Sequence, residues 1–163
     1  MRIVILSLWA ACIVCAQTGL KSPAAPVEQP LPFSHKKHSE LGLTCKTCHK
    51  NADPGESMGI AAVSSCMGCH KTAAAESPAI KRLARHAEMK SDPVWARVYL
   101  IPSYVFFSHR RHLESGATCQ TCHGPVAAQD QLRREIDISM GGCMECHVKN
   151  RARNDCNYCH EPR

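Results

Sequence analysis

Ten of the twelve cysteines fall into five CxxC pairs, and a histidine follows each pair immediately. This spacing constrains the chain more than any other feature, because it is the attachment signature of c-type haem. Two intervening residues set the thiols at the separation that two thioether bonds to one haem require. The next histidine then lies beside the iron as its proximal ligand. The five motifs are Cys45/Cys48–His49, Cys66/Cys69–His70, Cys119/Cys122–His123, Cys143/Cys146–His147 and Cys156/Cys159–His160.

Zinc sites and disulfides are the two alternative explanations of paired cysteines. Zinc sites often use CxxC units, but they do not require histidine at the next position. Disulfides would be favoured in an oxidising compartment. Since the chain has 10 histidines in 163 residues, five matches out of five arise by chance on the order of once in a million. The sequence therefore predicts five covalently bound haem c groups.

Five further histidines remain after the proximal ones are counted: His35, His38, His86, His109 and His112. One additional histidine for each haem predicts two imidazole ligands per iron, with no open coordination position. The alternative is that one or two of these histidines are ordinary surface residues.

A 17-residue phrase occurs twice, as FSHKKHSELGLTCKTCH at 33–49 and as FSHRRHLESGATCQTCH at 107–123, with 11 positions identical. The two histidines that open each copy are three residues apart, so on a helical turn they face roughly the same side. They cannot both bind one iron that already has a proximal histidine. Each phrase is therefore predicted to hold two haems together, and its duplication to extend a row of haems.

The pattern FxHxxH followed by CxxCH resembles that of the class III multihaem cytochromes c, especially the small triple-haem members. The resemblance implies a class III-like fold with little secondary structure, in which short α-helices and loops wrap around a haem core. It also implies that the first histidine of each phrase serves the next motif and the second serves the following one. The implied pairs are His35 with the haem at Cys45/Cys48, His38 with that at Cys66/Cys69, His109 with that at Cys119/Cys122, and His112 with that at Cys143/Cys146.

The fifth haem, at Cys156/Cys159, departs from the family pattern, because no histidine stands between His123 and Cys143. By elimination His86 is its predicted distal ligand. Met140 is the alternative ligand, and a methionine would raise the potential of that haem.

The phrases between the motifs extend the likeness over about residues 31–159. They resemble the pentahaem cytochrome subunits of alternative complex III and of related quinol-oxidising membrane complexes. The phrases that carry this likeness are SSCMGCH, WARVYLIPSYVFFSHRRH, CHGPV and SMGGCMECH.

The first 16 residues are predicted to be an export signal, because the apolar run 3–14 is too short to span a membrane. Cleavage after Ala16 is expected, and lipid attachment at Cys12 or Cys15 is the alternative. Export predicts a periplasmic location or the extracytoplasmic face of a membrane, lipid-anchored in the second case. The remaining chain divides into a Pro-rich linker at 17–32, a two-haem module at 33–72, a linker with a helix and an apolar segment at 73–106, and a three-haem module at 107–163.

Within the second linker, Ser77 and Pro78 read as the N-cap and first residue of a short helix that runs to about Lys90. Pro93 follows and excludes a longer helix. The apolar segment 94–107 is expected to be extended and to pack over haem faces, in preference to forming an interface.

Composition and charge favour a protein organised around haems over one that binds nucleic acid. Aromatic residues make up only 5% of the chain, so haems are expected to replace an ordinary core. The formal charge is +6, but haem propionates offset it, and the basic residues are spread along the chain without interleaved aromatics.

The expected function is one-electron transfer with redox partner proteins. A free shuttle and a subunit of a quinol-oxidising membrane complex are both consistent with the sequence. A multihaem reductase is disfavoured because catalysis needs an open haem, so no enzyme activity and no catalytic residues are predicted.

Overall fold

A computed structural model of the chain describes residues 24–51 and 57–160. Within these two ranges there are helices, turns and irregular segments but no β-strand. The predicted fold of short helices and loops is confirmed, whereas the predicted export signal and the first part of the Pro-rich linker lie outside the described residues. The helices are α1 (His35–Glu40), α2 (Cys45–Cys48), α3 (Val63–His70), α4 (Pro78–Glu88), α5 (His109–Glu114), α6 (Cys119–His123), the 3-10 helix η1 (Val126–Ala128), α7 (Met140–Lys149) and α8 (Cys156–His160).

The two copies of the repeated phrase fold in the same way. Each begins with a serine N-cap whose hydroxyl accepts a hydrogen bond from a backbone N–H, that of Lys37 for Ser34 at 3.1 Å and that of Arg111 for Ser108 at 3.4 Å. The cap orders one short turn, α1 or α5, so the two histidines of the phrase are held on a helix. The predicted helical turn is therefore confirmed in both copies.

The first CxxCH motif of each module also starts at the same kind of cap. Thr44 and Thr47 form a reciprocal capping box at the start of α2, and Thr118 and Thr121 form its counterpart at α6. Both boxes use a threonine at the third helical position in place of the more usual Glu or Gln. The spacing TCxTC thus fixes the backbone that carries both cysteines.

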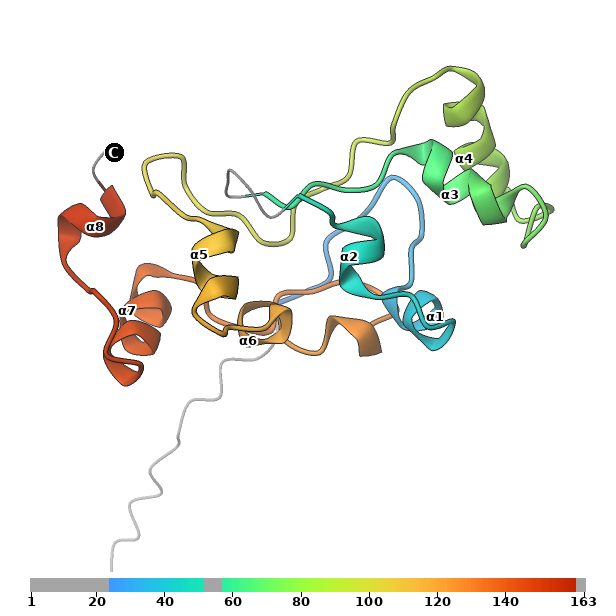
Figure 1. The fold of residues 1–163 in the computed structure, drawn as a ribbon. Coiled ribbons are helices and arrows are strands. Elements are labelled where there is room, and N and C mark those ends of the chain that lie inside the picture. Colours follow the sequence, from blue (N-terminus) through green and yellow to red (C-terminus); the bar gives the residue numbers. More distant parts are fainter. Residues whose placement is uncertain (1–23, 52–56, 161–163) are drawn as a thin grey trace, which may run out of the picture.

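The five motif helices follow one another across the molecule, in the order α3, α2, α6, α7 and α8 (Figure 1). This order differs from the order in the sequence, because the chain turns back after α2 and places α3 and α4 at one end. The three-haem module extends to the opposite end, where α8 lies. None of the described helices is long and apolar enough to cross a membrane.

Within residues 24–51 and 57–160, an ordinary hydrophobic core is present only where α3 meets α4. Leu31, Val63 and Leu83 are the buried apolar residues of the described chain, and Ile80 and Trp95 are among those that pack against them. The helix predicted from Ser77 is confirmed as α4, although the Ser77 side chain makes no capping bond. This small core fixes α4 against α3, and the other described segments have no buried apolar centre.

The apolar segment 94–107 contains no helix or strand, as expected for an extended connection. One part of this segment packs against the rest of the protein, and the other part is exposed. Trp95 contacts the small core and the Tyr99 hydroxyl donates to the backbone oxygen of His123 at 2.9 Å. By contrast, Val94 and Tyr104 are 90% and 67% exposed. The expected packing over the interior therefore holds for only part of the segment.

The two modules are tied together by α1 and the segment that follows α6. The backbone N–H of Lys36 donates to the oxygen of Gln129 at 3.0 Å, and the Ser34 hydroxyl donates to the carboxylate of Asp130 at 2.7 Å. Gln129 itself is buried. The stretch after CHGPV, which has no clear sequence pattern, thus serves as the strap between the modules.

We expect replacement of Ser34 by alanine to destabilise the protein more than replacement of Ser108. Both substitutions remove an N-cap, which costs about 1 kcal/mol. Only Ser34→Ala also removes the hydrogen bond to Asp130, so its free energy of unfolding should fall by roughly a further 1 kcal/mol. Denaturant unfolding of both variants checks this. Equal losses would show that the strap through Asp130 contributes nothing to stability.

Candidate haem-binding sites

Three pairs of imidazole rings stand at nearly the same separation. In each pair one ring comes from a repeated phrase and the other from a CxxCH motif. The ring centres are 6.0 Å apart for His38 and His70, 6.3 Å for His109 and His123, and 6.1 Å for His112 and His147. A metal–imidazole bond is about 2.0 Å long and the nitrogen lies about 1.1 Å from the ring centre, so two imidazoles on one metal have centres about 6 Å apart. The three pairs therefore fit an iron held between two histidines.

A fourth pairing is indicated by the surroundings of His35. Burial, and to a smaller extent the nearby imidazoles of His49 and His38, lowers the pKa of His35 to about 4. The Nδ1 atom of His35 is buried without a hydrogen-bond partner. His35 is thus a neutral imidazole beside the proximal histidine of the first motif, and the neutral form is the one that binds a metal.

Backbone oxygens orient most of the other rings. Each of five imidazoles places Nδ1 against a carbonyl, which leaves Nε2 directed toward a metal, as is usual for metal-binding histidines. The contacts are His38 to Ser34 at 2.8 Å, His112 to Ser108 at 2.8 Å, His49 to Gly59 at 2.6 Å, His70 to Ala73 at 2.9 Å and His147 to Arg153 at 2.6 Å.

The phenylalanine that opens each phrase contacts both of its histidines. Phe33 lies edge-on to His35 at 4.9 Å and parallel to His38 at 4.5 Å between ring centres. Phe107 repeats this with His109 and His112, both at 4.7 Å. These phenylalanines position the candidate ligand rings, a role that the sequence alone did not predict. The sequence signal for this role is that a phenylalanine opens both copies of the repeated phrase, two residues before the first histidine.

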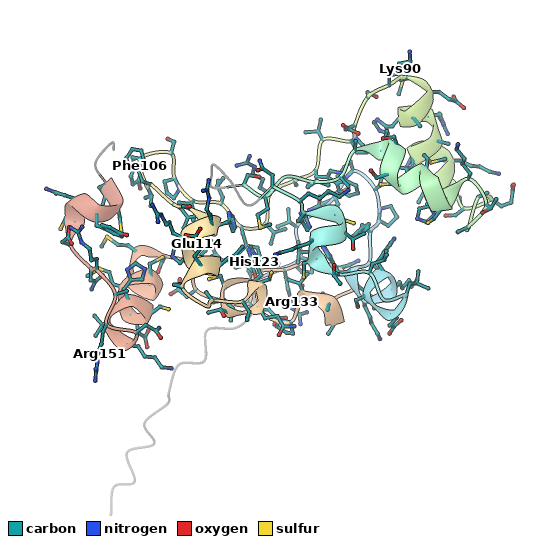
Figure 2. All side chains as sticks on the ribbon, viewed as in Figure 1. Lys90, Phe106, Glu114, His123, Arg133 and Arg151 are labelled. Atoms are coloured by element: carbon teal, nitrogen blue, oxygen red, sulfur yellow. The ribbon has the colours of Figure 1, made fainter. Side chains whose placement is uncertain are left out.

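The motif thiols of successive helices lie close to one another. Burial raises the pKa of four of these thiols, and a thiol of the neighbouring motif raises it further. The neighbours are Cys48 for Cys66, Cys45 for Cys119, Cys146 for Cys122, and Cys159 for Cys143. They give the same spatial order of motifs as the ribbon in Figure 1, with α2 and α6 adjacent at the centre. Figure 2 shows His123, the last residue of α6, in this central region.

The cysteines fit haem attachment better than the two alternatives. All ten motif cysteines are free of disulfide bonds. In the described ranges, no three His, Cys, Asp or Glu side chains gather as a zinc site would require. A haem iron needs only two ligands from the protein, which is what the imidazole pairs supply.

The structure does not bring His86 and the motif at Cys156/Cys159 together, although the sequence predicted that they pair. His86 lies on α4, which packs against α3, and α8 stands at the opposite end of the molecule (Figure 1). Figure 2 shows the same separation between Lys90, just beyond α4, and Phe106, which lies beside α8. The apolar side of α4 packs into the small core with α3, which holds the helix away from α8. His86 Nδ1 instead lies 3.2 Å from the Ser91 hydroxyl.

The surroundings of His160 contain a tyrosine where the other motifs have a second histidine. The ring centre of Tyr104 is 6.0 Å from that of His160, with 26° between the planes. The backbone N–H of Phe106 donates to the oxygen of Cys159 at 2.7 Å and holds this segment against α8. Met140, the alternative ligand, begins α7 with its side chain 68% exposed.

Two family patterns match the chain, and together they cover most of it. Residues 105–161 match cytochrome c7 and related cytochrome c, and residues 37–124 match cytochrome c3. The chain is also 28% identical over 162 residues to the "Menaquinone reductase, multiheme cytochrome c subunit" of Nitratidesulfovibrio vulgaris, covering 82% of this chain and 77% of that protein. Because the cytochrome c3 pattern spans more than half of the sequence, this chain belongs to the cytochrome c3 family of multihaem, class III-type cytochromes.

Proposed function

We propose that this chain binds five haem c groups and passes single electrons along them on the extracytoplasmic side of a membrane. The observation that carries the proposal is the repeated separation of about 6 Å between imidazole rings from different parts of the chain, which suits an iron between them. The haems supply the redox chemistry, and the protein sets their spacing and ligands.

The proposed attachment residues are the ten motif cysteines, and the proximal ligands are the histidines that follow each pair. The proposed distal ligands are His35 for His49, His38 for His70, His109 for His123, and His112 for His147. Phe33 and Phe107 hold the distal rings in place, and backbone carbonyls fix the Nδ1 atoms of His38 and His112.

The thiol contacts suggest one continuous route for electrons. Its order is the haem of α3, then those of α2, α6, α7 and α8. Electrons would enter at one end of this row and leave at the other. The surroundings of the two ends differ. The α3 end is covered by α4, whereas the α8 end is bordered by the exposed apolar segment near Tyr104.

The proposed partner is a quinone-linked membrane complex. The name of the relative connects that protein with menaquinone reduction, whereas the phrases between the motifs resemble subunits of quinol-oxidising complexes. The two likenesses agree on a quinone and differ in the direction of electron flow. A free periplasmic shuttle between redox proteins is the second candidate.

Purification in mild detergent separates these two candidates. A tagged chain, produced in its native host, should bring down an integral membrane protein in fixed proportion if it is a subunit. Recovery of the chain alone, with all haems bound, would favour the shuttle. A variant without Cys12 and Cys15 tests whether lipid attachment is what retains the protein at the membrane.

The exported protein should carry five haems, because each motif has two cysteines and a proximal histidine. Its intact mass should exceed that of the polypeptide by five haem groups. A variant with Cys66→Ala and Cys69→Ala, at the end of the row, is the matched control and should carry four. A wild-type mass with fewer than five haems would refute full occupancy.

A further inference from the structure

All ten histidines lie in the described residues, and eight of them form the four proposed pairs. The two that are left over are His86 and His160. They belong to opposite ends of the molecule (Figure 1), so the fifth proximal histidine has no second imidazole within its own chain. This follows from the position of α4, which its packing on α3 determines.

The position facing His160 is bordered by an apolar loop. Tyr104 lies in the turn before α5, with its ring 6.0 Å from His160 and 67% of its surface exposed. The hydrogen bond from Phe106 to Cys159 keeps the loop on α8. A phenol oxygen lies farther from its ring centre than an imidazole nitrogen does. A tyrosine ligand would therefore need a larger separation between ring centres than the 6.0 Å found here, so Tyr104 borders the space that faces His160 and is not placed as a ligand itself.

We propose that the haem attached to Cys156 and Cys159 has no protein ligand opposite His160 and binds a small neutral diatomic molecule there, next to Tyr104. The inference depends on the proposed haem attachment. A haem iron with one axial ligand from the protein is high-spin, and access and polarity on its free side decide what binds. Here the side of the haem opposite His160 is reached from solvent. It is bordered by the apolar loop and by Tyr104, whose phenol can donate a hydrogen bond. This would be the terminal haem of the row.

Met140 is the alternative ligand for the position opposite His160. It stands three residues before Cys143, and the thiol of Cys143 is close to Cys159. Its exposed side chain contacts solvent at the start of α7. A methionine ligand would make the fifth haem low-spin and would leave no place for an added molecule.

Carbon monoxide is the probe for the open position. The fully reduced protein should bind one carbon monoxide per chain, and the oxidised protein should give a high-spin signal from one haem in five. Tyr104→His should supply the missing imidazole, so both the high-spin signal and carbon monoxide binding should disappear. Leu100→His, which adds a histidine at an exposed site of the same segment, is the matched control and should leave both unchanged.

Several results would overturn the proposal. The intact mass of the same sample gives the number of bound haems, so a missing haem is not mistaken for a haem with a complete ligand set. Five bound haems with no high-spin signal would show a complete ligand set. If Met140→Ala then created the signal, methionine is the ligand. If the signal vanished with rising protein concentration and returned in His86→Ala, a second copy supplies the imidazole. A phenolate-to-iron charge-transfer band in the oxidised protein that disappears in Tyr104→Phe would show that the tyrosine oxygen is bound to the iron.

Discussion

Replacing His109 with alanine should convert the central haem from low-spin to high-spin and slow electron transfer between the two ends of the row. His109 faces His123 at 6.3 Å with the rings nearly parallel, at 7°. This haem lies between the two modules, since the thiols of Cys119 and Cys45 are neighbours. No route along the row avoids it, so the effect should exceed that of losing a ligand at either end.

Two measurements test the role of His109. The reduced variant should bind one carbon monoxide more than the wild type, and potentiometry should show one haem with a raised potential. His109→Met should restore a low-spin haem, again at higher potential, because thioether ligation favours the reduced iron. His86→Ala is the matched control, since His86 belongs to none of the four pairs, and its spectrum should equal that of the wild type. An unchanged spectrum in His109→Ala would remove His109 from the ligand set.

Without haem the polypeptide should not fold. Leu31, Val63 and Leu83 are its buried apolar side chains in the described ranges, and three such residues cannot offset the conformational entropy lost by a chain of this length. The helices α2, α6 and α8 have only four or five residues each, and isolated helices of that length are unstable in water. The haems must therefore supply both the interior and the cross-links.

Circular dichroism of the chain made in a host without haem-attachment enzymes checks this expectation. We expect little helical signal and no cooperative unfolding transition. The matched control is the haem-loaded Leu83→Ala variant, which loses a buried side chain at a typical cost of about 2–5 kcal/mol but should keep its fold. A cooperative transition in the haem-free chain would show that the polypeptide holds its own structure.

The sequence was sufficient to predict the repeated parts of the sites. The spacing of histidines in FxHxxH, together with the family likeness, predicted which rings would meet, and the structure brings His38 and His109 to the proximal histidines expected. The local caps explain this success. Serine and threonine at fixed offsets order each turn by short-range hydrogen bonds, which sequence spacing reports directly.

The pairing of His86 with the fifth haem depended on counting and not on local structure, and the structure does not bring the two together. The apolar positions Ile80, Leu83 and Ala87 define one side of α4, but they do not reveal which surface that side covers. Its partner turned out to be α3, through Val63 and Met67. The reversal of the chain after α2 is a long-range feature, and no residue pattern near it gives the resulting order of the motifs.

The central contact between α2 and α6 has a consequence for how such a molecule can lengthen. The first motifs of the two modules stand back to back there, with Cys45 beside Cys119, so later motifs of each module extend outward in opposite directions. A motif gained at the C-terminus, like that of α8, adds to an outer end and leaves the junction undisturbed. A row built in this way can be lengthened by one whole motif at a time, because each addition meets only the last motif of the row and not the contact between α2 and α6.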